Sequence, residues 1–218
     1  MTLTDIKLAL RAERLPPDVA EFLAEADARL NRLIHGTAYW GSGFVPSDFV
    51  TVYHALREVA QRNLAAGNCF CEWGSGFGVV TILADMLGFQ ACGIEIDRDL
   101  VDVASELAED FDAPVEFIHG SFIPPGHESD AEQAYAEHDG GVVWLSTEVD
   151  RAYDELGLDP DDFDLIFAYP WPGEEVVVDD LFARCAADGA LLLTYGQGNS
   201  VRLQRKVQNR IRAADHAS

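Results

Sequence analysis

The 218-residue sequence predicts an α/β fold built on a doubly wound, mostly parallel sheet. Short apolar runs, expected to be strands, alternate with longer segments whose apolar residues recur at helical spacing. The clearest case runs from Asn68 to Asp97 and reads as strand, glycine-rich turn, helix and strand. Two parallel strands joined through a helix form a βαβ unit, and such sheets bind ligands at the carboxyl ends of their strands.

The βαβ unit has clear boundaries in the sequence. We expect strands over residues 69–73 and 90–96 and a helix over residues 79–87. The helix should end at Gly88, because glycine is a typical residue just past a helix end. The turn over residues 74–78 reads Gly-Ser-Gly-Phe-Gly, and such a run of glycines favours a backbone that ordinary side chains would not allow.

The spacing of these glycines limits which ligand the turn can bind. A dinucleotide fingerprint, G-x-G-x-x-G, would need glycine at position 79, where the chain has Val79. A P-loop would need a lysine, and none lies near the turn. An NAD-dependent oxidoreductase is therefore disfavoured. The pattern that remains is E-x-G-x-G-x-G, formed by Glu72, Gly74, Gly76 and Gly78.

With the acid Glu95 closing the next strand, this pattern resembles the first two motifs of the class I, Rossmann-like S-adenosylmethionine-dependent methyltransferases. The resemblance implies S-adenosylmethionine as cofactor, which has a sulfonium, a zwitterionic tail and no phosphate. Glycines let the backbone approach that tail and leave amide donors for its carboxylate. Glu72 would serve its ammonium group, directly or through water, and Glu95 its ribose hydroxyls. The expected cofactor-binding residues are Glu72, Gly74, Ser75, Gly76, Gly78, Glu95, Ile96, Ser121 and Phe122. The alternative is a glycine-rich turn of an unrelated α/β protein.

Ser121 and Phe122 enter this set through the segment after a third strand, expected over residues 115–119. The family often has an acid at this place, which binds the adenine amino group. The chain has Gly120-Ser121-Phe122 instead. The serine hydroxyl can still accept that hydrogen bond, and the phenylalanine can lie against the adenine ring.

The candidate catalytic residues follow a fourth strand, expected over residues 164–169. The resemblance places this strand end beside the transferred methyl group. The sequence YPWPGEE there is similar to the [DNS]-P-P-[aromatic] signature of amino-group methyltransferases, although its first and third residues differ. Tyr169 and Pro170 at the strand end, Trp171 over the acceptor and Glu174 at the rim are expected to hold an amine. The alternative is a rigid proline turn with a packed tryptophan.

The N-terminal region is expected to form a helical cap of residues 1–36 beside a methyltransferase domain of residues 37–218. We expect a short helix over residues 2–15 and a stronger amphipathic helix over residues 18–34. The segment Phe44-Val45-Pro46 weakly resembles the part that precedes the first motif in the protein-lysine methyltransferases of this fold.

Further elements surround these motifs. A helix capped by Ser47 or Asp48 should run to about Gln61. A basic helix is expected over residues 201–212, which leaves no sequence for the usual C-terminal strand hairpin of the family. Either a strand over residues 142–145 substitutes for the hairpin or the sheet is shorter. The remaining expected elements are helices over residues 97–111, 129–138, 147–156 and 177–187 and a strand over residues 190–195.

The formal net charge of −23 is the most unusual property of the composition. Fifteen acids and a single base, Arg151, lie between Glu128 and Glu175. Such a surface repels phosphate backbones, which argues against nucleic acid as partner, and attracts cationic substrates. Acidity that serves only solubility or salt adaptation remains the alternative.

The sequence therefore predicts an S-adenosylmethionine-dependent methyltransferase whose acceptor is basic or bears an amine, either a protein side chain or a small molecule. An aminopropyl transferase of the same fold and a non-catalytic S-adenosylmethionine-binding module are the alternatives. The four cysteines form no C-x-x-C pair and are expected to be reduced and structural, and the scattered histidines predict no metal site. No apolar run approaches the ~18 residues of a membrane span, and we expect a cytoplasmic protein. The sequence does not indicate an oligomeric state.

Overall fold

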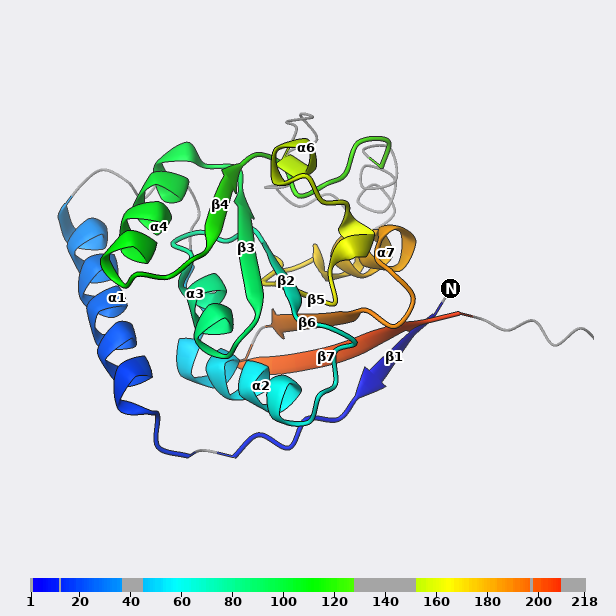
Figure 1. The fold of residues 1–218 in the computed structure, drawn as a ribbon, viewed down its shortest axis with the longest axis horizontal. Coiled ribbons are helices and arrows are strands. Elements are labelled where there is room, and N and C mark those ends of the chain that lie inside the picture. Colours follow the sequence, from blue (N-terminus) through cyan, green and yellow to red (C-terminus); the bar gives the residue numbers. More distant parts are fainter. Residues whose placement is uncertain (1, 12, 37–44, 128–151, 197, 209–218) are drawn as a thin grey trace, which may run out of the picture.

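A computed structural model of the protein describes residues 2–11, 13–36, 45–127, 152–196 and 198–208 (Figure 1). Its centre is a seven-stranded sheet in the order β1-β7-β6-β5-β2-β3-β4. Neighbouring strands from β6 to β4 are parallel, whereas β7 is antiparallel to both of its neighbours. The strands are β1 (Thr2–Ile6), β2 (Cys69–Trp73), β3 (Gln90–Glu95), β4 (Glu116–His119), β5 (Leu165–Ala168), β6 (Leu191–Gly196) and β7 (Ser200–Val207).

Helices cover both faces of the sheet, as a doubly wound fold requires (Figure 1). One face packs against α1 (Pro17–Gly36), α2 (Phe49–Gln61), α3 (Val79–Met86) and α4 (Arg98–Asp110). The opposite face packs against α6 (Ala152–Leu156) and α7 (Glu175–Cys185), with the short 3-10 helix η1 (Pro160–Asp162) beside them. Within the part of the chain that the structure describes, none of the helices has the length and apolar composition of a membrane span.

The buried strands alternate between the two cores at the period of two that a strand imposes. In β5, Leu165 and Phe167 belong to the core under α1–α4, and Ile166 belongs to the core under α7. In β2, Phe70 faces the first core and Cys71 the second. Cys69 and Cys71 therefore pack on the same face.

The predicted elements between residues 69 and 119 are confirmed, with small shifts at their ends. Helix caps explain why the boundaries could be predicted. The side chain of Asp48 accepts hydrogen bonds from the backbone amides of Val50 and Thr51, at 3.1 and 3.2 Å, and so begins α2. The Asp97 side chain accepts from the amide of Asp99 at 3.0 Å and begins α4.

The helix predicted over residues 2–15 is wrong, because residues 2–6 form the edge strand β1. Leu3 packs against the core under α7 and Ile6 against the core under α1–α4. A spacing of three puts two side chains on opposite faces of a strand, whereas on a helix they would share a face. Pairing with β7 satisfies the backbone, and Gln204 Nε2 donates to Asp5 Oδ1 at 2.9 Å.

The basic helix predicted over residues 201–212 is wrong as well, because residues 200–207 form β7. This strand pairs antiparallel with β6, so the expectation that the C-terminal hairpin is missing is also wrong. The bases are bound within the fold: Arg202 pairs with Asp179 at 2.5 Å, and Lys206 donates to the carbonyl of Ala186. The sheet reaches seven strands because the N-terminus supplies its edge strand.

Several predictions fall wholly or partly on residues that the structure does not describe. The helix over 129–138 and the strand over 142–145 lie outside the described residues, and α6 is the described part of the helix predicted over 147–156. The domain boundary after residue 36 stays a prediction, since residues 37–44 also lie outside them.

Candidate active site

A cavity of about 690 Å³ lies at the carboxyl ends of β2, β3, β4 and β5. Residues that precede and begin α2 complete its wall. Every candidate residue from the sequence lines it except Gly78, although these residues come from the ends of four strands and the loops that follow them. Those that line it are Glu72, Gly74, Ser75, Gly76, Glu95, Ile96, Ser121, Phe122, Tyr169, Pro170, Trp171 and Glu174.

The glycine turn lines this cavity with all of its residues except Gly78 and takes a backbone path that favours glycine. Gly74, Gly76 and Gly78 have φ angles of 73°, 52° and 71°, in the left-handed region. The amides of Gly74 and Ser75 both donate to the carbonyl oxygen of Ile94, at 2.9 and 3.0 Å. These bonds hold the turn against the end of β3.

Glu95 joins the glycine turn to the loop that follows β3. Its Oε2 accepts from the amide of Gly76 at 2.8 Å, and its Oε1 accepts from the amide of Asp97 at 3.0 Å. Burial raises the pKa of Glu95, and the hydrogen bonds from the two amides oppose that shift. The carboxylate is thus fixed in place at the cavity wall.

Glu72 is the second buried carboxyl group of the cavity, with 4% of its surface exposed. Its Oε2 accepts from both the amide and the hydroxyl of Thr81, at 2.9 and 2.6 Å, across the first turn of α3. Burial raises the pKa of Glu72 to about 8, the bonds from Thr81 oppose the rise, and the nearby charge of Glu95 adds to it.

The proline turn after β5 also lines the cavity. The amide of Trp171 donates to Glu174 Oε2 at 3.2 Å, and the amide of Glu174 donates back to the carbonyl of Trp171 at 2.8 Å. Glu174, expected at the rim, is buried in the wall, with 5% of its surface exposed. Tyr169 packs edge-on against Tyr195, with ring centroids 4.9 Å apart.

Solved structures share this architecture. No protein-family model matches the sequence, and no curated protein is significantly similar to it. A methyltransferase from Geobacter sulfurreducens superimposes with a TM-score of 0.53 at 16% identity, over 90% of this chain and 93% of that one. An RNA methyltransferase from Salinibacter ruber, in complex with S-adenosyl-L-homocysteine, gives a TM-score of 0.52 at 17% identity, over 80% of this chain and 100% of that one. The chain has the class I methyltransferase fold.

In this methyltransferase fold, Gly78 lies outside the cavity lining and has a packing role. A Cβ built on Gly78 would lie 2.3 Å from Cζ of Phe117 and 2.9 Å from Cβ of Ala104. Glycine therefore lets α3 begin in close contact with β4 and α4. The cofactor contact predicted for Gly78 stays a prediction.

We expect Gly78→Ala to lower the free energy of unfolding by ~1–3 kcal/mol more than Gly88→Ala does. Both glycines have positive φ, but nothing lies within 4 Å of a Cβ at Gly88. The two variants share the backbone strain, so the difference isolates the contact with Phe117. Urea unfolding of both proteins measures it, and equal losses would contradict the packing role.

Ser75, a residue of the glycine turn, packs against β3. A Cβ on Gly93 would lie 2.6 Å from Cβ of Ser75, so the serine side chain packs onto β3 where only glycine leaves room. Its Oγ is buried and has no hydrogen-bond partner among the residues that the structure describes. A contact between Ser75 and cofactor stays a prediction.

Phe122 is held by two residues that the sequence did not single out. Its ring stacks on Trp73, with centroids 5.3 Å apart and planes 8° from parallel, and its carbonyl accepts from the hydroxyl of Tyr153 at 2.7 Å. Ser121 accepts from the amide of Ile123 at 3.1 Å. These contacts fix the position of the segment after β4 in the cavity lining.

Arg98 and Phe49 are further lining residues that the sequence did not reveal. Arg98 Nη2 donates to Nδ1 of His119 at 3.1 Å, and His119 Nε2 lies 3.0 Å from the carbonyl oxygen of Ile96. This places the histidine proton on Nε2 and makes His119 a support for Arg98. Phe49 follows the Val45-Pro46 segment. The resemblance of that segment to the part before the first motif was a signal in the sequence for this region.

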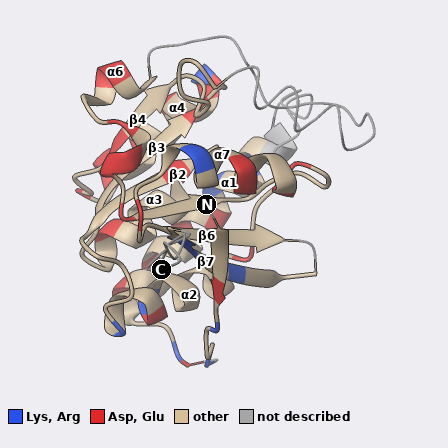
Figure 2. Ribbon diagram, turned by 90° about the vertical axis from the view of Figure 1, so that its right-hand side faces the viewer, with Lys and Arg blue, Asp and Glu red and all other residues tan. Residues whose placement is uncertain are grey.

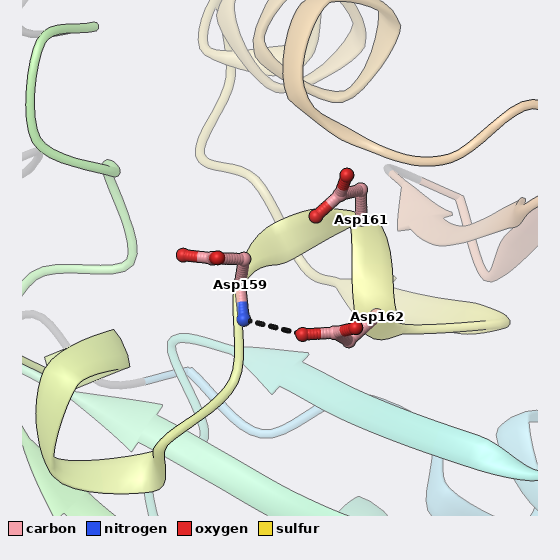
Figure 3. A group of neighbouring side chains, drawn as sticks. All are labelled: Asp159, Asp161 and Asp162. Atoms are coloured by element: carbon pink, nitrogen blue, oxygen red, sulfur yellow. Dashed lines mark hydrogen bonds between the residues drawn. The ribbon is translucent and has the colours of Figure 1, made fainter.

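A group of three carboxylates, Asp159, Asp161 and Asp162, lies outside the cavity lining (Figure 3). All three residues are exposed, and Asp162 Oδ2 accepts from the amide of Asp159 at 2.8 Å. That bond belongs to the cap of the short turn η1, which explains the cluster without a ligand. Figure 2 shows that acidic residues are spread over many elements, whereas Lys and Arg are few.

Proposed function

We propose that this protein is an S-adenosylmethionine-dependent methyltransferase. The observation that carries the proposal is the convergence of the E-x-G-x-G-x-G turn and the buried carboxyl groups of Glu72 and Glu95 on one cavity of a methyltransferase fold. The cavity volume of about 690 Å³ falls in the range of cofactor-sized sites. A non-catalytic binding module and an aminopropyl transferase are the rival functions.

The chemistry of the lining fits this cofactor. Carboxylates suit an ammonium group and ribose hydroxyls, which are all donors, and the lining offers Glu72 and Glu95 for these roles. Ile96 and Phe122 supply an apolar wall for adenine. When bound, S-adenosylmethionine supplies a methyl group already activated by its sulfonium.

The residues of this chain align the acceptor with the methyl group and exclude water from the cavity. Methyl transfer is an in-line displacement, so positioning of the acceptor contributes most of the catalysis and a general base is not essential. Tyr169, Pro170 and Trp171 form the wall that the resemblance places beside the methyl group. Val45, which precedes α2, and Phe49, the first residue of α2, also line the cavity.

We infer that the acceptor is basic or bears an amine and is a protein side chain or a small molecule. Four carboxyl groups and one guanidinium line the cavity, and Arg98 already binds His119. A formal net charge of −23 repels phosphate backbones, which disfavours nucleic acid. The similar Salinibacter ruber protein is an RNA methyltransferase, but one fold hosts many acceptors and the site decides between them.

Calorimetry and a transfer assay test this function together. The full chain should bind S-adenosylmethionine and should move a tritiated methyl group to amine or protein pools in preference to RNA or DNA. Binding without transfer to any pool would favour the non-catalytic module. Preference for decarboxylated S-adenosylmethionine would favour the aminopropyl transferase, and efficient methylation of naked RNA or DNA would contradict the proposed acceptor class.

Glu174→Gln should raise the Michaelis constant for an amine acceptor about tenfold or more, because a charge-assisted contact contributes ~1.5–3 kcal/mol. The glutamine oxygen can still accept from the amide of Trp171, so the wall keeps its shape. Glu175→Gln is the matched control, because it removes a charge one residue away, outside the cavity lining. Steady-state kinetics at two salt concentrations measure both, and equal effects would refute a specific role for Glu174.

A further inference from the structure

Two carboxyl groups, Glu72 and Glu95, share one buried region of the cavity. Within the described part of the chain, neither makes an ion pair with Lys, Arg or His. Both side chains end in hydrogen bonds to backbone amides or to a hydroxyl. Among the described residues, dipoles are therefore what balances their charges.

The other charged or titratable groups around the cavity come from three elements. Asp97 and Arg98 lie at the start of α4, Glu174 lies at the start of α7, and the phenol of Tyr169 lies at the end of β5. On α3, the residue that faces Glu72 is the uncharged Thr81. Glu95 is the charged residue that acts on Glu72, and it acts by repulsion. An extra negative charge on Glu72 is thus unfavourable while the cavity holds no cationic ligand.

The protonation state of Glu72 in the ligand-free protein follows from this environment. Burial and the charge of Glu95 raise its pKa to about 8, against the two hydrogen bonds from Thr81. Near neutral pH, most molecules therefore carry the Glu72 proton. A cation inside the cavity would reverse the balance, since an opposite charge favours the ionised form.

We propose that Glu72 releases its proton to solvent when a cationic cofactor enters, so that the ionisation of this carboxyl group follows the charge of the ligand in the cavity. The inference rests on the proposed function. The O–H bond of the Glu72 carboxyl group breaks, the proton passes to the buffer, and the carboxylate keeps its two hydrogen bonds from Thr81. S-Adenosylhomocysteine keeps the ammonium group and lacks the sulfonium, so it releases less of the proton.

The expected pH dependence has a definite sign. The cofactor binds to the form of the protein in which Glu72 is ionised. Its affinity should therefore rise with pH, by at most about tenfold per pH unit, as long as Glu72 of the ligand-free protein still holds its proton. Above pH 8 the affinity should level off. The amino group of the ligand titrates as well. The quantity to read is therefore the difference between wild type and Glu72→Gln, which share that ligand.

Folding stability gives a second readout that needs no ligand. The pKa of Glu72 in the folded protein lies above the ordinary value of 4.5, so this carboxyl group stabilises the fold fully below 4.5. That stabilisation is lost as pH rises through about 8. The empty wild type should therefore lose stability relative to Glu72→Gln over this interval.

Calorimetry of the full chain near neutral pH, in buffers of different ionisation enthalpy, counts the protons exchanged. Wild type should release about one proton per S-adenosylmethionine bound and clearly less per S-adenosylhomocysteine. Glu72→Gln should abolish the difference between the two ligands. Asp85→Asn is the matched control, because burial also raises the pKa of Asp85 but this residue lies outside the cavity lining.

Thr81→Val is a second variant in case Glu72→Gln does not fold. It removes the hydroxyl that binds the ionised form, so the rise in affinity should move to higher pH. Binding without proton release, or release that persists in Glu72→Gln, would overturn the inference and leave the proposed function standing. Absence of any S-adenosylmethionine binding by the wild type would instead overturn the proposed function itself.

Discussion

Glu95→Ala is expected to weaken S-adenosylmethionine binding by ~2–4 kcal/mol, or roughly 30- to 1,000-fold. The proposed ribose clamp loses two charge-assisted hydrogen bonds. The variant also releases the amides of Gly76 and Asp97, which Glu95 now holds at 2.8 and 3.0 Å. The glycine turn and the loop after β3 therefore lose the group that joins them.

S-Adenosylhomocysteine should lose affinity by the same factor, because it carries the same ribose. Asp97→Ala provides the control. It removes the cap of α4 and should cost ~0.5–2 kcal/mol of folding stability, with little effect on cofactor affinity. Calorimetry with both ligands on both variants decides the assignment. If Asp97→Ala weakens the cofactor more than Glu95→Ala does, the clamp has been assigned to the wrong acid.

Local signals in the sequence were sufficient for the central βαβ unit. The turn glycines, the caps at Asp48 and Asp97 and the apolar spacing act within a few residues, and the structure confirms the elements that they predicted. The topology brings the candidate site residues together, because the carboxyl ends of neighbouring parallel strands meet at one edge of a sheet.

The termini could not be predicted in this way because their structure depends on distant partners. Thr2 pairs with Val207 at the opposite end of the chain, and no local pattern reports such a pairing. The bases of residues 201–207 suggested a solvated helix. Arg202 instead binds Asp179 on α7, and Arg205 donates to the carbonyl of Leu64 at 2.6 Å.

The physical state of the candidate site also depends on three-dimensional packing. Trp73 reads as an ordinary strand residue, yet it is the surface on which Phe122 stacks. Glu72 was predicted from its place in the motif, but the sequence does not show that it is 4% exposed and lies beside a second buried carboxyl group. Spacing along the chain carries no information on burial or on the repulsion between groups that folding brings together.

Gly76→Val should cost at least ~2 kcal/mol of S-adenosylmethionine affinity, about 30-fold, because the site depends on the backbone of the turn. Gly76 has a φ of 52°, a region in which a β-branched residue is a genuine outlier. Its amide holds Glu95 Oε2, so a shift of the turn also moves the proposed clamp. Calorimetry measures the loss, and circular dichroism shows whether the fold survives.

Gly157→Val supplies the comparison that separates a local effect from general destabilisation. Gly157 has a similar φ of 65°, nothing lies within 4 Å of a Cβ built there, and it lies outside the cavity lining. Strain at Gly157 should therefore lower stability and leave cofactor affinity unchanged. Equal losses of affinity in the two variants would attribute the effect to destabilisation of the whole fold. Full affinity in a folded Gly76→Val protein would mean that the ligand does not approach the glycine turn, and the proposed cofactor site would then be wrong.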